Sequence, residues 1–186
     1  MSPHAPYSPA GARLPGARGL TRVAVALAAA GLMSACANMS DTPPGASLQD
    51  VEARYGKADY SCPVGQGGQR LIWTQQPYGQ YAWTAVADAS GKIDRIVPAL
   101  TDARFRALDT GSWTPEQVRC EFGPPAEVSL IGLPGARQVV WSYRYKQDGV
   151  WNSLMYVYFG ADGRRVTRHH AGPDPMFDPI EPGTFW

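Results

Sequence analysis

The chain repeats one of its own segments, and this repeat restricts the fold more than any other feature of the sequence. Residues 47–58 align without gaps on residues 114–125, at an offset of 67. Each copy begins with Ser or Thr, which cap helix N-termini, and later carries a glycine that suits a left-handed C-terminal cap. Val51 and Tyr55 share one helical face, because they are four residues apart. The repeat therefore predicts two short helices of the same design, each with an abrupt end.

Strand-like sequence follows each predicted helix. Residues 70–74 match residues 138–142 at an offset of 68, and glycine-containing turns separate the later segments. Such a succession is typical of antiparallel hairpins. The expected strands are 70–74, 80–87 and 92–97 in the first copy, and 138–142, 153–159 and 164–169 in the second. With an extra helix at 102–108, the sequence predicts an α+β fold of two tandem units, each with short helices on a three-stranded antiparallel sheet.

These elements divide the chain into five parts. Prolines and small polar residues after Cys36 indicate a flexible tether, and prolines recur in the C-terminal segment. The expected boundaries are 1–35 for a leader, 36–46 for the tether, 47–100 for the first unit, 101–170 for the second unit and 171–186 for a proline-rich tail.

The leader ends in small and apolar residues before a cysteine. Three arginines and no acidic residue precede the apolar run 23–32, which leads through Met33, Ser34 and Ala35 to Cys36. A membrane span needs about 20 apolar residues, so this shorter run predicts a cleaved signal peptide. The pattern resembles bacterial lipoprotein signal peptides, in which fatty acids such as palmitate are attached to the cysteine.

This resemblance implies a lipid anchor at Cys36. In that family an Asp after the cysteine retains the lipoprotein in the inner membrane, whereas this chain has Ala37. The resemblance therefore implies the periplasmic face of the outer membrane. An ordinary cleavage site with an incidental cysteine is the alternative.

Cleavage before Cys36 changes the charge of the chain. It leaves 14 basic and 16 acidic residues, which give a net charge of −2. Proteins that bind nucleic acids need basic surfaces to neutralise phosphates. Nucleic acid is therefore not expected as a partner.

The two remaining cysteines, Cys62 and Cys120, are a disulfide candidate. The periplasm oxidises thiols, and a bridge between these residues closes a long loop. Two buried free thiols are the alternative, because a bridge requires Cα atoms within about 7 Å of each other. No metal site is expected, since the chain has no Cys-x-x-Cys pattern.

No catalytic motif is recognisable, and neither enzymatic activity, a cofactor nor a small-molecule substrate is expected. His169 and His170 are adjacent on a predicted strand, so their side chains point to opposite faces. Neither a nucleophile elbow nor a Ser-x-x-Lys motif occurs. A carboxylate pair remains an alternative. It would come from the acidic residues in the middle of the chain: Asp102, Asp109, Glu116, Glu121 and Glu127.

A longer pattern lies in the second unit. It consists of Leu108, Gly111, Thr114, Gln117, Val118, Phe122, Gly123 and Pro125, followed by Trp141, Tyr143, Tyr156, Tyr158, Phe159 and Gly163. This pattern resembles the SmpA/OmlA (BamE-like) family over residues 101–169, and residues 47–97 match more weakly. The resemblance implies helices packed on a three-stranded antiparallel sheet in each unit. A tandem of such units is also similar in topology to the β-lactamase inhibitor protein (BLIP).

Aromatic residues are the candidate binding residues. Tyrosines recur at every second position of two predicted strands, and the tail ends on two aromatic residues. The candidates are Trp141, Tyr143, Tyr145, Tyr156, Tyr158, Phe185 and Trp186. Core packing is the alternative for the strand residues, and a disordered remnant is the alternative for the tail.

The family resemblance implies a lipid-anchored lipoprotein that binds envelope proteins, among them the β-barrel assembly machinery, in outer-membrane protein assembly or envelope integrity. The first alternative is a BLIP-like binder or inhibitor of a periplasmic enzyme. The second is an envelope hydrolase that uses a carboxylate pair.

Overall fold

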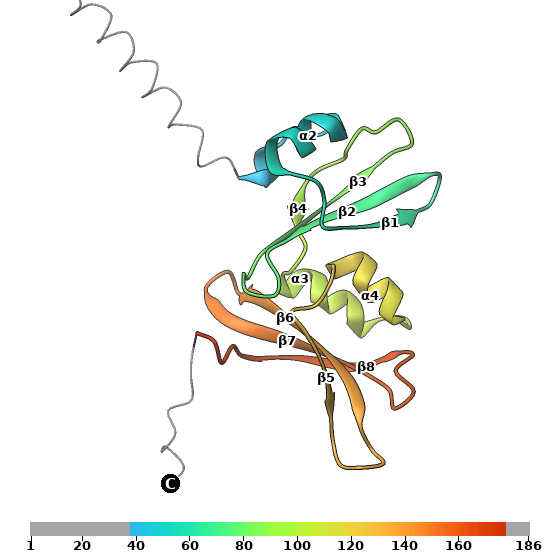
Figure 1. The fold of residues 1–186 in the computed structure, drawn as a ribbon, viewed down its shortest axis with the longest axis vertical. Helices are drawn as coiled ribbons and strands as arrows, with labels where there is room; N and C mark the ends of the chain where they lie inside the picture. The colour runs from blue at the N-terminus through green and yellow to red at the C-terminus, as the bar shows by residue number, and fades with distance from the viewer. Residues whose placement is uncertain (1–37, 178–186) are drawn as a thin grey trace, which may run out of the picture. The chain divides into compact units, whose positions relative to one another are not determined.

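The computed structural model describes residues 38–177 (Figure 1). The proposed lipidation site Cys36 and the aromatic tip Phe185-Trp186 lie outside the described residues. Within residues 38–177, none of the helices has the length and apolar character that a membrane span needs.

The described chain has the expected α+β character, with two antiparallel sheets of four strands each. The first unit contains α2 (Leu48–Tyr55), β1 (Tyr60–Val64), β2 (Gly68–Thr74), β3 (Ala82–Ala87) and β4 (Val97–Pro98). The second contains α3 (Asp102–Phe105), the 3-10 helix η3 (Arg106–Asp109), α4 (Pro115–Phe122), β5 (Glu127–Ile131), β6 (Gln138–Gln147), β7 (Trp151–Phe159) and β8 (Val166–Pro173). In each sheet the strands follow one another in chain order.

The prediction of three strands per sheet is wrong, because an additional strand precedes the expected ones in each unit. β1 pairs with β2 and β5 pairs with β6, so both form sheet edges. The expected strand at 92–97 is reduced to β4. Its first half forms only an isolated bridge to β3, between Ile93 and Ala87. On its other side the Ile93 N–H donates to the Ala46 carbonyl at 3.0 Å, and the Gly45 N–H donates to the Ile93 carbonyl at 2.8 Å.

Residues 38–46, expected to belong to a flexible tether, instead pack against the first unit. A 3-10 turn, η2 (Met39–Asp41), begins this segment, and Thr42 is buried. Met39 and Ala46 contact the apolar cluster between α2 and the first sheet. The described segment is therefore part of the folded unit.

The two repeated helices have the predicted caps. The Ser47 side chain accepts from the Asp50 N–H at 3.1 Å, and the Thr114 side chain accepts from the Gln117 N–H at 3.3 Å. Gln117 completes a capping box, because its side-chain oxygen accepts from the Thr114 N–H at 2.8 Å. Both helices end at a glycine with a φ of 86°, a value that favours glycine over residues with a Cβ.

Replacing the cap of α4 is expected to destabilise the protein moderately. In Thr114→Ala the Gln117 N–H loses its side-chain acceptor, which lowers the free energy of unfolding by about 1 kcal/mol. Urea unfolding followed by circular dichroism measures this loss. Thr114→Ser keeps the hydroxyl and is expected to retain most of the stability; equal losses in both variants would contradict the capping role.

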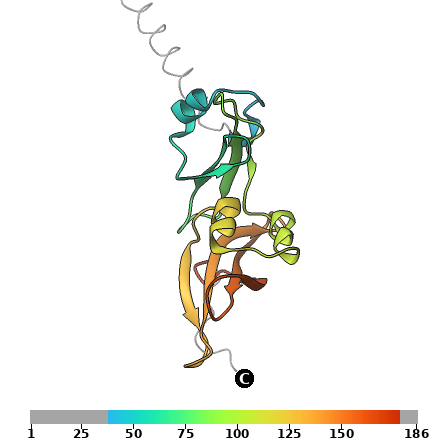
Figure 2. The same ribbon diagram turned by 90° about the vertical axis from the view of Figure 1, so that its right-hand side faces the viewer.

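Helices and sheets alternate along the folded unit in the order α2, first sheet, α3 with α4, second sheet (Figures 1 and 2). Leu71 and Trp73 of β2 join the cluster that includes Val51 of α2. Their neighbour Ile72 points to the other face and joins the larger cluster, which includes Val118 and Phe122 of α4. The first sheet is therefore buried on both faces, and the helices of the second unit lie between the two sheets.

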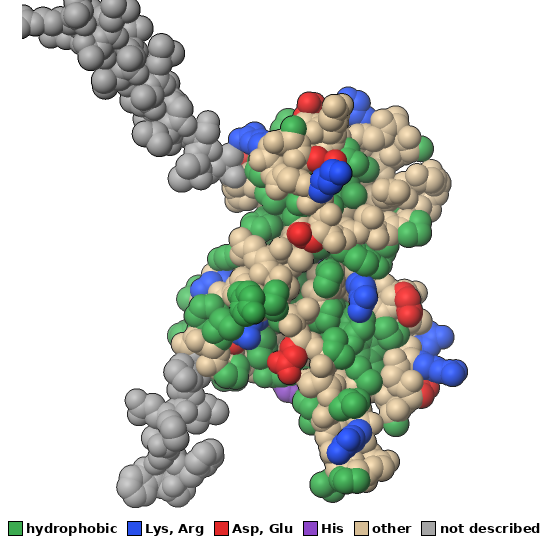
Figure 3. All heavy atoms as spheres, viewed as in Figure 1, with side chains coloured by type: hydrophobic (Ala, Val, Ile, Leu, Met, Phe, Trp, Pro, Cys, Tyr) green, Lys and Arg blue, Asp and Glu red, His purple; other side chains and the backbone are tan. Residues whose placement is uncertain are grey.

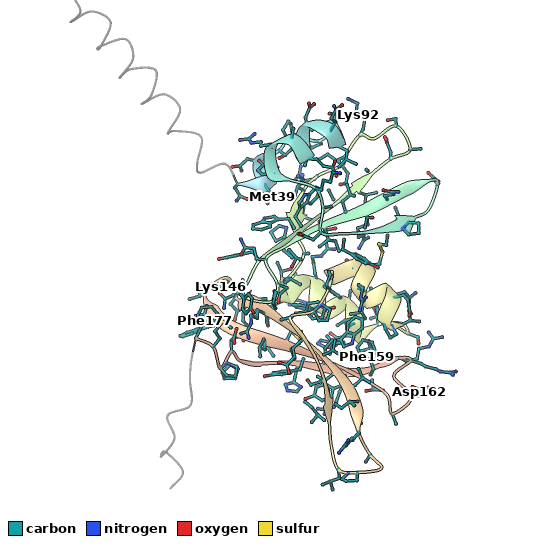
Figure 4. The ribbon with its side chains drawn as sticks, in the orientation of Figure 1. Met39, Lys92, Lys146, Phe159, Asp162 and Phe177 are labelled. Carbon is teal, nitrogen blue, oxygen red and sulfur yellow. A yellow bond between two sulfur atoms is a disulfide. The ribbon has the colours of Figure 1, made fainter. Side chains whose placement is uncertain are left out.

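Covalent and ionic contacts also join the two units. Cys62 of β1 and Cys120 of α4 form a disulfide, with their Cα atoms 5.8 Å apart (Figure 4). Glu121 of α4 forms an ion pair with Arg70 of β2 in the first unit, and a second one with Arg104 of α3 in its own unit. Both contacts lie where α4 meets the first sheet.

Candidate functional site: an exposed apolar surface

Three of the proposed binding residues lie in the core instead. Tyr143 and Tyr145 of β6 are fully buried and Trp141 is 6% exposed. The Tyr143 hydroxyl donates to the Gly123 carbonyl at 3.1 Å, and the Tyr145 hydroxyl donates to Asp102 Oδ1 at 2.8 Å. Burial raises the pKa of both tyrosines. Their assignment to a binding surface was wrong, because this face of β6 packs against α3 and α4.

Tyr156 and Tyr158 lie on the opposite face of the second sheet. Tyr158 is only 8% exposed, and the Arg168 guanidinium lies 3.5 Å from the centre of its ring. The His170 ring stacks on Tyr158, with the ring centres 5.4 Å apart, and is tilted against Tyr156, with the ring centres 5.3 Å apart. Tyr156 is half-buried. These rings cover their own sheet, so Tyr158 is not available as a binding residue and Tyr156 is only partly available.

The most exposed aromatic residues of the described chain lie in a turn and at the start of a strand: Tyr78 in the loop before β3, and Trp151 at the first position of β7. Tyr78 is 74% exposed and Trp151 is 67% exposed. Together with four other exposed residues they form what we term the loop-end surface, which consists of Tyr78, Tyr81, Val150, Trp151, Met176 and Phe177. Apolar side chains gather at this end, on the left of the space-filling view (Figure 3). Exposed apolar patches of this kind on soluble domains mark interaction sites.

Arg144 of β6 holds the first part of this surface in place. The Gln76 side chain donates to the Arg144 carbonyl at 2.8 Å and accepts from the Arg144 N–H at 3.2 Å. Arg144 Nε also donates to the Pro77 carbonyl at 2.7 Å. The loop that carries Tyr78 is thereby attached to the second sheet.

The same arginine holds the segment after β8. Its guanidinium forms an ion pair with Asp174, whose side chain is fully buried. Asp174 Oδ1 accepts from the Met176 N–H at 3.0 Å, and the Asp174 N–H donates to the Asn152 carbonyl at 3.2 Å. Three segments that are distant in the sequence therefore meet around one buried ion pair, and their apolar side chains remain exposed.

A cavity of about 460 Å³ lies beside the loop-end surface. Tyr81, Leu100 and Ala103 contribute apolar lining, and Lys146 and Asp148 lie at its polar side. Figure 4 labels Lys146 of β6 and Phe177 at this end. The cavity is a depression next to the loop-end surface, with both apolar and polar residues in its lining.

The acidic residues considered as a catalytic pair include three with structural contacts. Asp102 accepts from Tyr145 and from the Asp148 N–H, and Asp109 contacts His169 at 2.8 Å. Glu121 is held by its two arginines. Among residues 38–177, no cluster of three or more His, Cys, Asp and Glu side chains has the arrangement of a metal site.

None of the loop-end residues is among the binding residues predicted from the sequence. A signal was present, since Tyr78 lies between Pro77 and Gly79, and Val150 and Trp151 follow Gly149. Turn residues are usually small or polar, so large apolar side chains there indicate a role outside the core. Met176 and Phe177 likewise follow Pro175, but their position beside the other loops depends on the buried contact of Asp174 with Arg144.

No protein-family model, no curated protein and no solved structure matches this chain.

Proposed function

We propose that this chain is a lipoprotein anchored through Cys36 to the periplasmic face of the outer membrane, where it binds other envelope proteins without catalysing a reaction. On this proposal the chain is a protein of the SmpA/OmlA (BamE-like) type that contains two such units in tandem. Its partners are proteins of outer-membrane assembly or envelope integrity, with the β-barrel assembly machinery as the first candidate.

The observation that carries this proposal is the loop-end surface. Its six large side chains are each at least 46% exposed, and the Arg144–Asp174 ion pair has contacts with three of the segments that carry them, at Pro77, Asn152 and Met176. A rigid apolar surface loses little conformational entropy when it binds, and aromatic residues are enriched where proteins bind tightly. Protein binding therefore accounts for this surface better than does catalysis or nucleic-acid binding.

Site-specific photocrosslinking in cells tests the binding role. A photoreactive amino acid replaces Trp151 or Tyr78 in the full chain, and adducts are identified by mass spectrometry. We expect both positions to form adducts with envelope proteins, because both side chains are more than 60% exposed on the loop-end surface. The same photoreactive residue at Ala89, in the turn after β3, is the matched control.

The outcomes separate the parts of the proposal. Protein binding through this surface would be contradicted if adducts at Trp151 and Tyr78 were no more abundant than adducts at Ala89. Adducts with one periplasmic enzyme alone would favour an inhibitor in place of an assembly factor. Labelled palmitate tests the anchor independently: the wild-type chain incorporates it and Cys36→Ser does not.

A further inference from the structure

The second sheet has an unprotected edge at β5. This strand pairs only with β6, so its other side presents unpaired backbone N–H and C=O groups. Val128 and Leu130 lie on one face of β5 and are 56% and 64% exposed. The hairpin that β5 forms with β6 reaches the lower end of the folded unit in both ribbon views (Figures 1 and 2).

The corresponding edge of the first sheet is blocked. β1 contains Pro63, which lacks an N–H to donate, and Cys62, which is tied to α4 by the disulfide. β5 contains neither proline nor a basic residue, and Glu127 is its only charged residue. Natural proteins usually protect edges with proline or with charged residues, especially lysine, so an edge with exposed apolar residues and one carboxylate at its first position indicates a pairing partner.

We propose that β5 pairs antiparallel with β5 of a second copy of this chain, about a two-fold axis at Ser129. In this register Val128 of each copy lies opposite Leu130 of the other, and the four apolar side chains become contiguous on one face. On the other face Glu127 lies opposite Ile131, so the two carboxylates stay apart. The strand is thus complementary to itself, and pairing joins the two second sheets into one.

The position of β5 is compatible with the proposed binding role. The β5–β6 hairpin and the turn that carries Val150 lie at opposite ends of β6, so pairing leaves the loop-end surface free. Five residues per strand give an interface below the roughly 1,200 Å² of stable complexes, and association in dilute solution is weak. Confinement to one bilayer, which rests on the proposed anchor, raises the effective concentration.

A cysteine at the two-fold axis tests this pairing in cells. In Ser129→Cys the new thiols of two copies face each other, with Cα atoms about 4.5–5.5 Å apart, a spacing that allows a disulfide. Cys62 and Cys120 are already paired, so they do not compete. Non-reducing gels of the full chain should show at least about tenfold more linked dimer than Ala89→Cys, an exposed cysteine in the turn after β3.

A second variant tests whether strand pairing causes the link. Adding Val128→Lys to Ser129→Cys places a charge beside the joined strands and should reduce the linked dimer about tenfold. Equal dimer from Ser129→Cys and Ala89→Cys would overturn the proposal, and so would a Ser129→Cys link mainly to a different protein. Sedimentation of the purified chain at high concentration tests β5 pairing without a membrane. Failure of the proposed lipid anchor can thereby be told apart from failure of the β5 pairing.

Discussion

Loss of the Cys62–Cys120 disulfide should destabilise the protein by about 4 kcal/mol. The two cysteines are 58 residues apart, and a cross-link of this length removes about that much conformational freedom from the unfolded chain. In Cys62→Ser/Cys120→Ser the unfolded state regains this freedom. The expected result is a urea midpoint well below that of the wild type and a melting temperature lower by about 10 °C.

A reducing agent provides the matched control. Dithiothreitol should lower the stability of the wild type to that of the double variant, and it should leave the double variant unchanged. The measurement is urea unfolding with and without dithiothreitol, followed by tryptophan fluorescence. A double variant within about 1 kcal/mol of the oxidised wild type would show that the bridge contributes little to folding.

Local sequence rules predicted the helices well because their determinants are local. Ser47 and Thr114 lie at the predicted N-caps, and Gly56 and Gly123 end the helices as expected. Each of these features depends on groups within a few residues of one another. The local sequence is therefore sufficient to predict where such helices begin and end, without knowledge of the tertiary contacts.

The first edge strand of each sheet, β1 or β5, was missed for a physical reason. β1 includes Pro63, which is rare in strands, and β5 carries exposed residues on both faces. Pro63 interrupts β1, and in β5 polar and apolar residues alternate only over residues 127–130, the shortest pattern that identifies a half-buried strand. Their pairing depends on neighbours supplied by β2 and β6.

The layered packing and the candidate site depend on contacts between distant segments. Leu71, Ile72 and Trp73 are all apolar and all buried, a run that is typical of a strand covered on both faces. The sequence contained this clue, but it could not show that α4 supplies the second cover. The loop-end surface depends likewise on Arg144, which contacts residues 67 or 68 positions earlier and 30 positions later.

Truncating Phe122 should cost about 4 kcal/mol of unfolding free energy. Its side chain is fully buried in the cluster between the two sheets, with its ring centre 4.8 Å from that of Phe105 and 6.1 Å from that of Tyr143. Phe122→Ala leaves a cavity there, and surrounding residues from both sheets cannot close it without strain. Urea unfolding monitored by circular dichroism measures the loss.

The repeat itself supplies the control for this experiment. Tyr55 occupies the position in α2 that Phe122 occupies in α4, but it is only partly buried, because among the described residues no second sheet covers α2. Tyr55→Ala should therefore cost about 1–2 kcal/mol, through lost packing and the loss of its contact with Thr42. If the two variants lost equal stability, α4 would be no more enclosed than α2. A clearly larger loss in Phe122→Ala is the result that layered packing requires, since only α4 lies between two sheets.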